Sequence, residues 1–85
     1  MKVGIPQPLR GYTKEERVEA FGASVDALLL DLDRRYPGIR FRMVDEQGRL
    51  RPHVRVFVNR ERVQSLATPL AADDDVQILQ ALSGG

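Results

Sequence analysis

The clearest periodic pattern in the chain is a run of apolar residues between positions 25 and 36. Apolar side chains recur there three or four residues apart, as on the buried stripe of a helix, at Val25, Leu28, Leu29, Leu32 and Tyr36. Ser24 stands just before the run and can accept a hydrogen bond from a free N–H group of the first turn. Pro37-Gly38 follows the run and stops a helix. The pattern predicts one main helix between Ser24 and Pro37, with one buried face.

A second pattern, strict alternation, runs through residues 54–58 and 76–81 and predicts two strands. Branched aliphatic side chains at the even positions share one face: Val54, Val56, Val58, Val76 and Ile78. The odd positions fall on the opposite face and include Phe57 and Leu79. Weaker patterns predict short strands at 2–5 and 16–21, forming an N-terminal hairpin, and at 62–64.

Turn-forming residues separate these elements, at Gly11, 45–48, 59–61, 68–70 and 73–75. Residues 39–44 fit either a short strand or a helical turn. The order is therefore β-β-α-β-β-β, and one helix packed across one face of a small mixed sheet satisfies the layer rule for a small domain. We predict an α+β fold of the β-grasp, or ubiquitin-like, kind, with four to five strands and one main helix. In that arrangement the last strand lies near the middle of the sheet.

Length and composition limit the organisation of the protein. The 85 residues allow one domain, which we place at residues 1–82, followed by a flexible C-terminal tail at 83–85. The absence of cysteine excludes disulfides and thiolate metal sites and fits a reducing compartment. No apolar run approaches the roughly 18 residues of a membrane span, and the N-terminus has no signal-peptide pattern. We therefore expect a cytoplasmic protein with no membrane partner.

Positive charge is concentrated in the middle of the chain. Residues 34–62 carry a net charge of +6, owing to nine arginines, whereas the remainder carries −5 and the whole chain +1. A basic middle steers association toward an acidic protein or a nucleic acid. The alternative is a solvated sheet face whose arginine stems cover apolar surface. The few aromatic residues follow no RNA-reading pattern, so we expect no nucleic-acid partner.

Candidate catalytic and metal-binding residues are few. His53 is the only histidine, and without cysteine or clustered acids it favours a strand edge over a metal site. The acids Asp73–Asp75 lack the ligand spacing of a calcium loop and are interpreted as a solvated turn. No glycine-rich phosphate loop, Ser-His-Asp set or nucleophilic cysteine is present. We expect no metal site, no bound cofactor and no catalytic activity in this chain alone.

The most distinctive chemistry lies at the C-terminus, where Gly84-Gly85 follows the last predicted strand. Glycine has no Cβ, so such an end can thread a narrow active site and leave the carboxylate of Gly85 open to attack. A chance pair or a cloning remnant would give the same two residues. The position directly behind a strand favours the functional interpretation, in which the terminal carboxylate of Gly85 is the reactive group.

Several short stretches follow the pattern of a known family in the expected order along nearly the whole chain. They are Val3–Pro6, Tyr36–Gly38, Asp45–Leu50, Val56–Asn59, Thr68–Leu70, Asp75–Leu79 and Gly84-Gly85. On these residues the chain resembles the ubiquitin-like sulfur carriers, a family that includes the small subunit of molybdopterin synthase and the thiamine-pathway sulfur carrier. The resemblance is closest to the carriers that serve cysteine biosynthesis. Gln80, where relatives commonly carry proline, and Ala72–Asp74, where a glycine often lies, depart from the pattern.

The resemblance implies how Gly85 is used. An adenylating, ubiquitin-activating-like enzyme uses ATP to adenylate the Gly85 carboxylate. Sulfur from a donor such as a rhodanese or a desulfurase then displaces AMP, and the thiocarboxylate delivers sulfur to a sulfide-accepting synthase, with a cysteine precursor as one acceptor. The chain is then a carrier that acts as a co-substrate of its partners. Two alternatives share the resemblance: the small subunit of molybdopterin synthase, and a ubiquitin-like modifier conjugated through Gly85.

Partner enzymes must also hold the folded body of the carrier. If the helix covers the valine face of the sheet, Phe57 and Leu79 form an exposed apolar patch rimmed by arginines at 55, 60 and 62. The alternative is a second face that is itself partly covered. We predict that partners contact this patch and the tail, at Arg55, Phe57, Leu79, Ala81, Leu82, Ser83 and Gly84.

Overall fold

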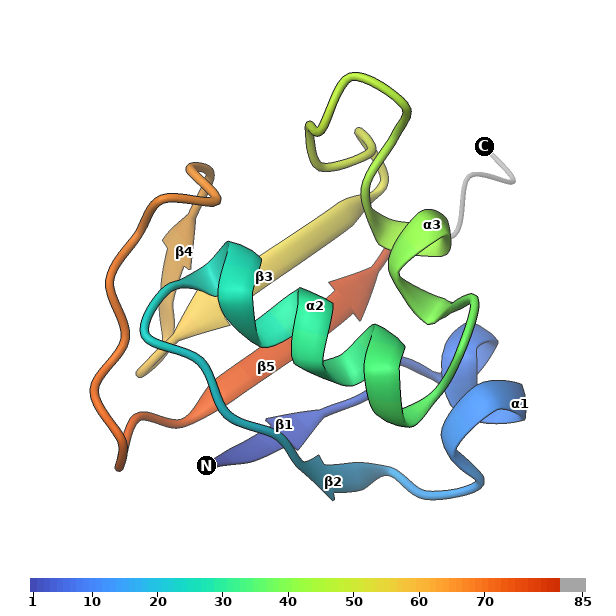
Figure 1. Cartoon of the computed structure of the whole chain (residues 1–85), viewed down its shortest axis with the longest axis horizontal. Coiled ribbons are helices and arrows are strands. Elements are labelled where there is room, and N and C mark those ends of the chain that lie inside the picture. The colour runs from blue at the N-terminus through green and yellow to red at the C-terminus, as the bar shows by residue number, and fades with distance from the viewer. Residues whose placement is uncertain (82–85) are drawn as a thin grey trace.

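The structure is a computed structural model, and it describes residues 1–81. It contains a five-stranded sheet with one long helix lying across one of its faces (Figure 1). In chain order the elements are β1 (Lys2–Gly4), η1 (Gln7–Leu9), α1 (Arg10–Thr13), β2 (Arg17–Glu19), α2 (Val25–Arg35), α3 (Ile39–Met43), β3 (Val54–Val58), β4 (Glu61–Val63) and β5 (Val76–Gln80). The predicted α+β fold with one main helix is confirmed.

Strand β5 lies at the centre of the sheet, whose strand order is β2-β1-β5-β3-β4. It runs parallel to β1, with Val3 opposite Val76, and antiparallel to β3, with Val56 opposite Ile78. Parallel pairing of the first and last strands beneath a crossing helix is the β-grasp arrangement. The prediction that the last strand lies near the middle of the sheet is therefore confirmed, and the sequence beyond residue 81 continues from this central strand.

Helix α2 begins and is oriented as its local sequence predicts. The Oγ of Ser24 accepts a hydrogen bond of 3.2 Å from the backbone N–H of Ala27 and caps the first turn. Four residues of the predicted apolar stripe are fully buried in one cluster with the valines of β3 and β5: Val25, Leu28, Leu29 and Leu32. The fifth, Tyr36, is partly buried and packs against this cluster. The helix ends at Arg35, ahead of Pro37. Burial of this stripe is what holds the helix layer on the sheet.

Asp31 ties the segment before α2 to the helix. Its carboxylate accepts hydrogen bonds from the backbone N–H of Phe21 and from the side chains of Arg34 and Arg35. These donors, the Phe21 amide first, lower the pKa of Asp31 far below its ordinary range. Because the carboxyl has a lower pKa in the folded than in the unfolded state, its contribution to stability is present near neutral pH and is lost only in strong acid.

The connection between β1 and β2 differs from the predicted turn at Gly11. Residues 7–13 form the short helices η1 and α1 instead. Pro8 lies in the first turn of η1, where the N–H that proline lacks would have no helical partner in any case. Strands β1 and β2 still pair antiparallel, with Val3 opposite Val18. The predicted hairpin is thus present, but its strands are joined by a helical excursion.

The segment that the sequence left open between strand and helix is helical. Helix α3 spans Ile39–Met43 and buries the side chains of both its end residues. Gly38 precedes it with a φ of 98°, in the left-handed region that glycine adopts without strain. This one residue breaks the course of α2 and lets α3 start in a new direction.

The β3–β4 hairpin turns through two residues, Asn59 and Arg60, with φ values of 51° and 72°. Two positive φ angles match the right-handed twist of the flanking strands, as in type I′ hairpin turns. Strand β4 therefore starts at Glu61, one residue earlier than predicted, and Val63 lies opposite Val56.

Two observations concern the chain as a whole. No helix within residues 1–81 is long and apolar enough to cross a membrane. The boundary between a body at 1–82 and a tail at 83–85 falls at residues outside the described part of the chain, so that division stays a prediction.

Candidate functional site

The two faces of the sheet carry different side chains. The face toward α2 holds the buried residues of β3 and β5, including Val56 and Ile78. On the opposite face the register sets Arg55 against Leu79 and Phe57 against Gln77. Leu79 is 44% exposed although it belongs to the central strand, and Phe57 is partly buried. An apolar side chain is therefore left in contact with solvent in the middle of the sheet.

A groove of about 600 Å³ lies on this face. We call it the open-face groove and define it by its lining residues Ile5, Pro6, Gln7, Pro8, Arg10, Arg55, Phe57, Gln77, Leu79, Gln80 and Ala81. Four residues predicted to bind partners lie in it together: Arg55, Phe57, Leu79 and Ala81. Two arginines beside an apolar floor suit a protein partner, because such interfaces combine an apolar centre with a charged rim. Arg60 lines a smaller hollow next to it, over Phe57 and Leu79.

One wall of the open-face groove, residues 5–10, was not anticipated from the sequence. The sequence pattern predicts a strand end and a turn here, although two prolines are also a signal of a rigid, exposed segment. The Nε of Arg10 donates a 3.0 Å hydrogen bond to the carbonyl oxygen of Ile5 and holds the wall in place. The wall comes next to β5 only because β1 pairs with that strand.

Gly4 shapes the same face. A Cβ at this position would lie 2.2 Å from the side-chain oxygen of Gln77. Because Gly4 has no side chain, the side chain of Gln77 has room to lie across β1. The surface beside Leu79 therefore stays unobstructed.

The end of β5 is anchored to the start of β3. The backbone N–H of Ala81 donates a 2.8 Å hydrogen bond to the carbonyl oxygen of His53. His53 lies directly before β3 and is partly buried, in keeping with the predicted position at a strand edge. The anchor fixes the direction in which the chain leaves the sheet. The other predicted site residues, Leu82, Ser83, Gly84 and the reactive Gly85, lie outside the described residues.

The acidic run at 73–75 is part of the fold rather than only a solvated turn. The Asp74 carboxylate accepts hydrogen bonds from the backbone N–H of Ala71 and from the Asn59 side-chain amide. These two donors, Ala71 first, lower the pKa of Asp74. Asp75 pairs with Arg17 at 2.7 Å. Within residues 1–81 no three histidine or acidic side chains gather as a metal site would require.

Comparison with known proteins identifies the family. The model of the ThiS family matches residues 3–85. The chain belongs to the ThiS family. The sulfur carrier protein CysO of Mycobacterium tuberculosis is 39% identical over 89 residues, which cover 98% of this chain and 96% of that protein.

Solved structures agree with the family assignment. The crystal structure of the BexX/CysO complex of Amycolatopsis orientalis contains a chain that matches with a TM-score of 0.90 and 38% identity, covering 99% of this chain and 98% of its own. SAMP1, the small archaeal modifier protein 1 of Haloferax volcanii, matches with a TM-score of 0.81 and 27% identity, covering 100% of this chain and 98% of that chain. The β-grasp prediction is confirmed by both.

The ThiS family assignment confirms the predicted resemblance to ubiquitin-like sulfur carriers. The chain is a sulfur carrier similar to CysO, and it is a carrier rather than a catalyst.

Proposed function

We propose that the carboxylate of Gly85 is the group that carries sulfur. In the first step this carboxylate attacks the α-phosphorus of ATP on an activating enzyme and releases pyrophosphate, so that AMP becomes the leaving group. A persulfide sulfur of a rhodanese or desulfurase then attacks the acyl carbon and expels AMP. A second thiol then attacks the donor's sulfur in the resulting S–S bond, which leaves a thiocarboxylate on Gly85 and a disulfide between that thiol and the donor cysteine. The activation is needed because a free carboxylate is a poor electrophile.

The observation that carries this proposal is the position of Gly84-Gly85 in sequence, separated by three residues from the end of the central strand of a ThiS-family fold. Strand β5 is paired on both sides, and its end is fixed through Ala81 and His53. A fixed exit makes the reach of the last four residues predictable, at about 13 Å when extended. The thiocarboxylate then hands sulfur to a biosynthetic acceptor such as a cysteine precursor, in line with the similarity to CysO.

Intact mass spectrometry tests the proposal. The chain is incubated with ATP, the activating enzyme and a persulfide donor, and a gain of about 16 Da is expected as sulfur replaces one oxygen of the activated acyl group. Reactions without ATP serve as the control and should show no gain. A wild-type chain that keeps its mass with every component present would contradict the proposal.

The similarity to SAMP1 of Haloferax volcanii favours a second candidate function, a protein modifier. Its chemistry shares the adenylation of Gly85, but lysine amines rather than sulfur then displace AMP. Immunoblots of cell extract would separate the two functions. A ladder of larger covalent products, in place of the 16 Da species, is the outcome that favours the modifier.

The activating enzyme is expected to dock on the open-face groove, and Leu79→Glu tests this. A charge placed in the apolar centre of an interface removes buried contact area, so binding should weaken about tenfold or more. The fold should persist, because Leu79 is already 44% exposed and the new carboxylate would face Arg55 across the strands. The measurement is isothermal titration calorimetry of the variant with the activating enzyme.

Leu30→Glu is the matched control for this prediction. Leu30 is 51% exposed and lies on α2, on the other side of the sheet from the groove. It undergoes the same change of charge and should leave the affinity within about twofold of the wild type. Equal affinities of the two variants would rule out the groove as the docking surface.

A further inference from the structure

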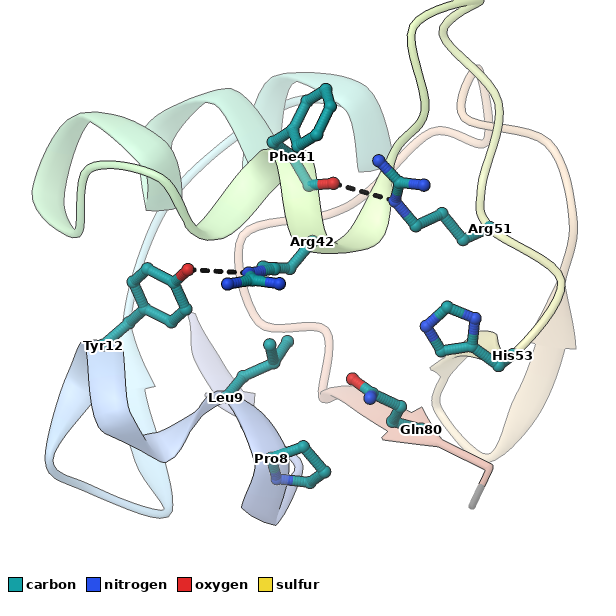
Figure 2. A pocket seen from close by; sticks show the side chains of 8 residues that line it. All are labelled: Pro8, Leu9, Tyr12, Phe41, Arg42, Arg51, His53 and Gln80. Atoms are coloured by element: carbon teal, nitrogen blue, oxygen red, sulfur yellow. Dashed lines mark hydrogen bonds between the residues drawn. The ribbon is translucent and has the colours of Figure 1, made fainter. Parts of the chain in front are cut away.

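A second hollow, of about 550 Å³, adjoins the open-face groove at the end of β5. We call it the arginine pocket; Figure 2 shows its lining residues Pro8, Leu9, Tyr12, Phe41, Arg42, Arg51, His53 and Gln80. They come from η1, α1, α3, the segment before β3, and the last residue of β5. Pro8 and Gln80 line both hollows, so the arginine pocket and the groove form one continuous surface around the point where the chain leaves the sheet.

The two guanidinium groups of the pocket are each held through Nε, and within residues 1–81 their outer nitrogens form no hydrogen bond. The Nε of Arg42 donates a 2.9 Å hydrogen bond to the hydroxyl of Tyr12, and the Nε of Arg51 donates a 2.8 Å hydrogen bond to the carbonyl oxygen of Phe41 (Figure 2). The Arg51 guanidinium also stacks 4.7 Å from the centre of the Phe41 ring. Arginines fixed in this way lose little side-chain entropy when they bind an anion.

Neither arginine forms an ion pair with a carboxylate of residues 1–81, although the pKa of Asp45 is lowered first by the backbone N–H of Arg49 and also by the charge of Arg51. Arg10, Arg17, Arg34, Arg35 and Arg40 each form an ion pair. Arg42 and Arg51 form none within residues 1–81, and no acidic residue lines the pocket. His53 adds a third nitrogen-bearing side chain to the same space (Figure 2). The pocket therefore gathers two arginines without an acidic residue among its lining residues, and Asp45 offsets the charge of Arg51 only through a longer-range interaction.

Gln80 indicates what kind of anion fits. Its side chain extends from the end of β5 into the space near Leu9 and His53 (Figure 2), and its Oε1 is buried without a hydrogen-bond partner among residues 1–81. A free carboxylate offers only acceptors, and a free phosphate adds at most a hydroxyl donor. A peptide segment offers a carboxylate for the arginines together with backbone N–H donors, which the amide of Gln80 can accept after turning toward the pocket.

We propose that the arginine pocket receives an aspartate or glutamate side chain from the enzyme that docks on the open-face groove. The carboxylate lies between the guanidinium groups of Arg42 and Arg51, and charge-assisted hydrogen bonds to both set the rotation of the carrier on its partner. Since the pocket borders the exit of β5, this contact orients the C-terminal segment toward the catalytic site. The inference rests on the proposed function, because it concerns the same partner.

The first test compares the binding of the activating enzyme to two double variants. Arg42→Gln with Arg51→Gln should weaken binding of the activating enzyme about tenfold or more and make the affinity less sensitive to added salt. Arg34→Gln with Arg49→Gln removes the same charge from exposed arginines outside the pocket and should stay within about twofold of the wild type. Equal affinities of the two double variants would overturn the inference. Formation of the thiocarboxylate by the wild type is scored separately, so failure of the proposed function is distinguishable.

A second test uses the carrier without the activating enzyme. Side-chain Nε–H signals of Arg42 and Arg51 are followed by NMR during titration with acetyl-Gly-Glu-Gly-amide, acetyl-Gly-Gln-Gly-amide and inorganic phosphate. Saturable shifts with the glutamate peptide alone, lost in the Arg42→Gln, Arg51→Gln variant, support the inference. Shifts with phosphate but not with the glutamate peptide, or with neither, would overturn it. Melting curves recorded on each variant ensure that only folded protein is compared.

Discussion

Removal of Gly84-Gly85 is expected to reduce sulfur loading at least about a hundredfold. A chain ending at Ser83 still has a terminal carboxylate, but that carboxylate stops about 7 Å short of the reacting position. Displacement of a reacting group by even about 1 Å can cost a hundredfold in rate, so this shortfall should remove the 16 Da product within a normal assay. The measurement is the initial rate of the mass gain, with a melting curve to show that the truncated chain is folded.

In the same assay, Gly85→Ala distinguishes the effect of chain length from the effect of an added side chain. This variant keeps the length of the chain and adds only a Cβ next to the carboxylate. A strong loss of loading would mean that the activating enzyme admits the chain through a channel too narrow for a side chain. The hypothesis fails if the truncated chain is loaded at the parent rate, since the last two residues would then have no part in the chemistry.

Gly22→Ala is expected to destabilise the fold by about 3 kcal/mol or more, because the new methyl group has no space. A Cβ on Gly22 would lie 2.3 Å from the backbone nitrogen of Leu28 and 2.7 Å from the carbonyl carbon of Ala27. Both atoms belong to the backbone of α2, so relief requires a shift of the whole helix on the sheet. Thermal denaturation should show a midpoint lower by about 12 °C or more for a domain of this size.

Gly11→Ala provides the contrast. Gly11 lies within α1, and a Cβ there would meet no atom within 4 Å. Alanine favours a helix over glycine by about 0.5–1 kcal/mol, so this variant should melt at or slightly above the wild-type midpoint. If the two alanine variants had the same denaturation midpoint, close packing of the chain at residue 22 against α2 would be disproved.

Much of the fold is predictable because its signals are local. The start of α2 depends on Ser24 and its end on Pro37-Gly38, and both follow from the sequence. The alternation in β3 and β5 is enough to separate the buried valines from Phe57 and Leu79. The strand end before Pro6 is predicted correctly, whereas the turn at Gly11 is wrong, because residues 7–13 form two short helices and Pro8 lies in the first turn of one of them.

The composition of the two hollows is not predictable in the same way. The side chains that form the arginine pocket are separated by up to about seventy positions in sequence. Tyr12 and Arg42 meet only after α1 and α3 have packed at the same end of the sheet. Similarly, the wall at residues 5–10 joins the open-face groove because β1 pairs with β5. No local pattern encodes such contacts, since each depends on strand register and on how layers pack.

By itself the sequence determined the main helix, the two faces of the principal strands and the diglycine that follows them. Those features depend on residue spacing and on the chemistry of single residues, which are properties of neighbours in the chain. Only the tertiary structure decided that residues 5–10 form a wall beside the open face and which arginines gather at the exit of β5. The reason is physical. Burial and charge at a surface are set by segments that are distant in sequence, and these segments come together only when the other strands pair on either side of β5.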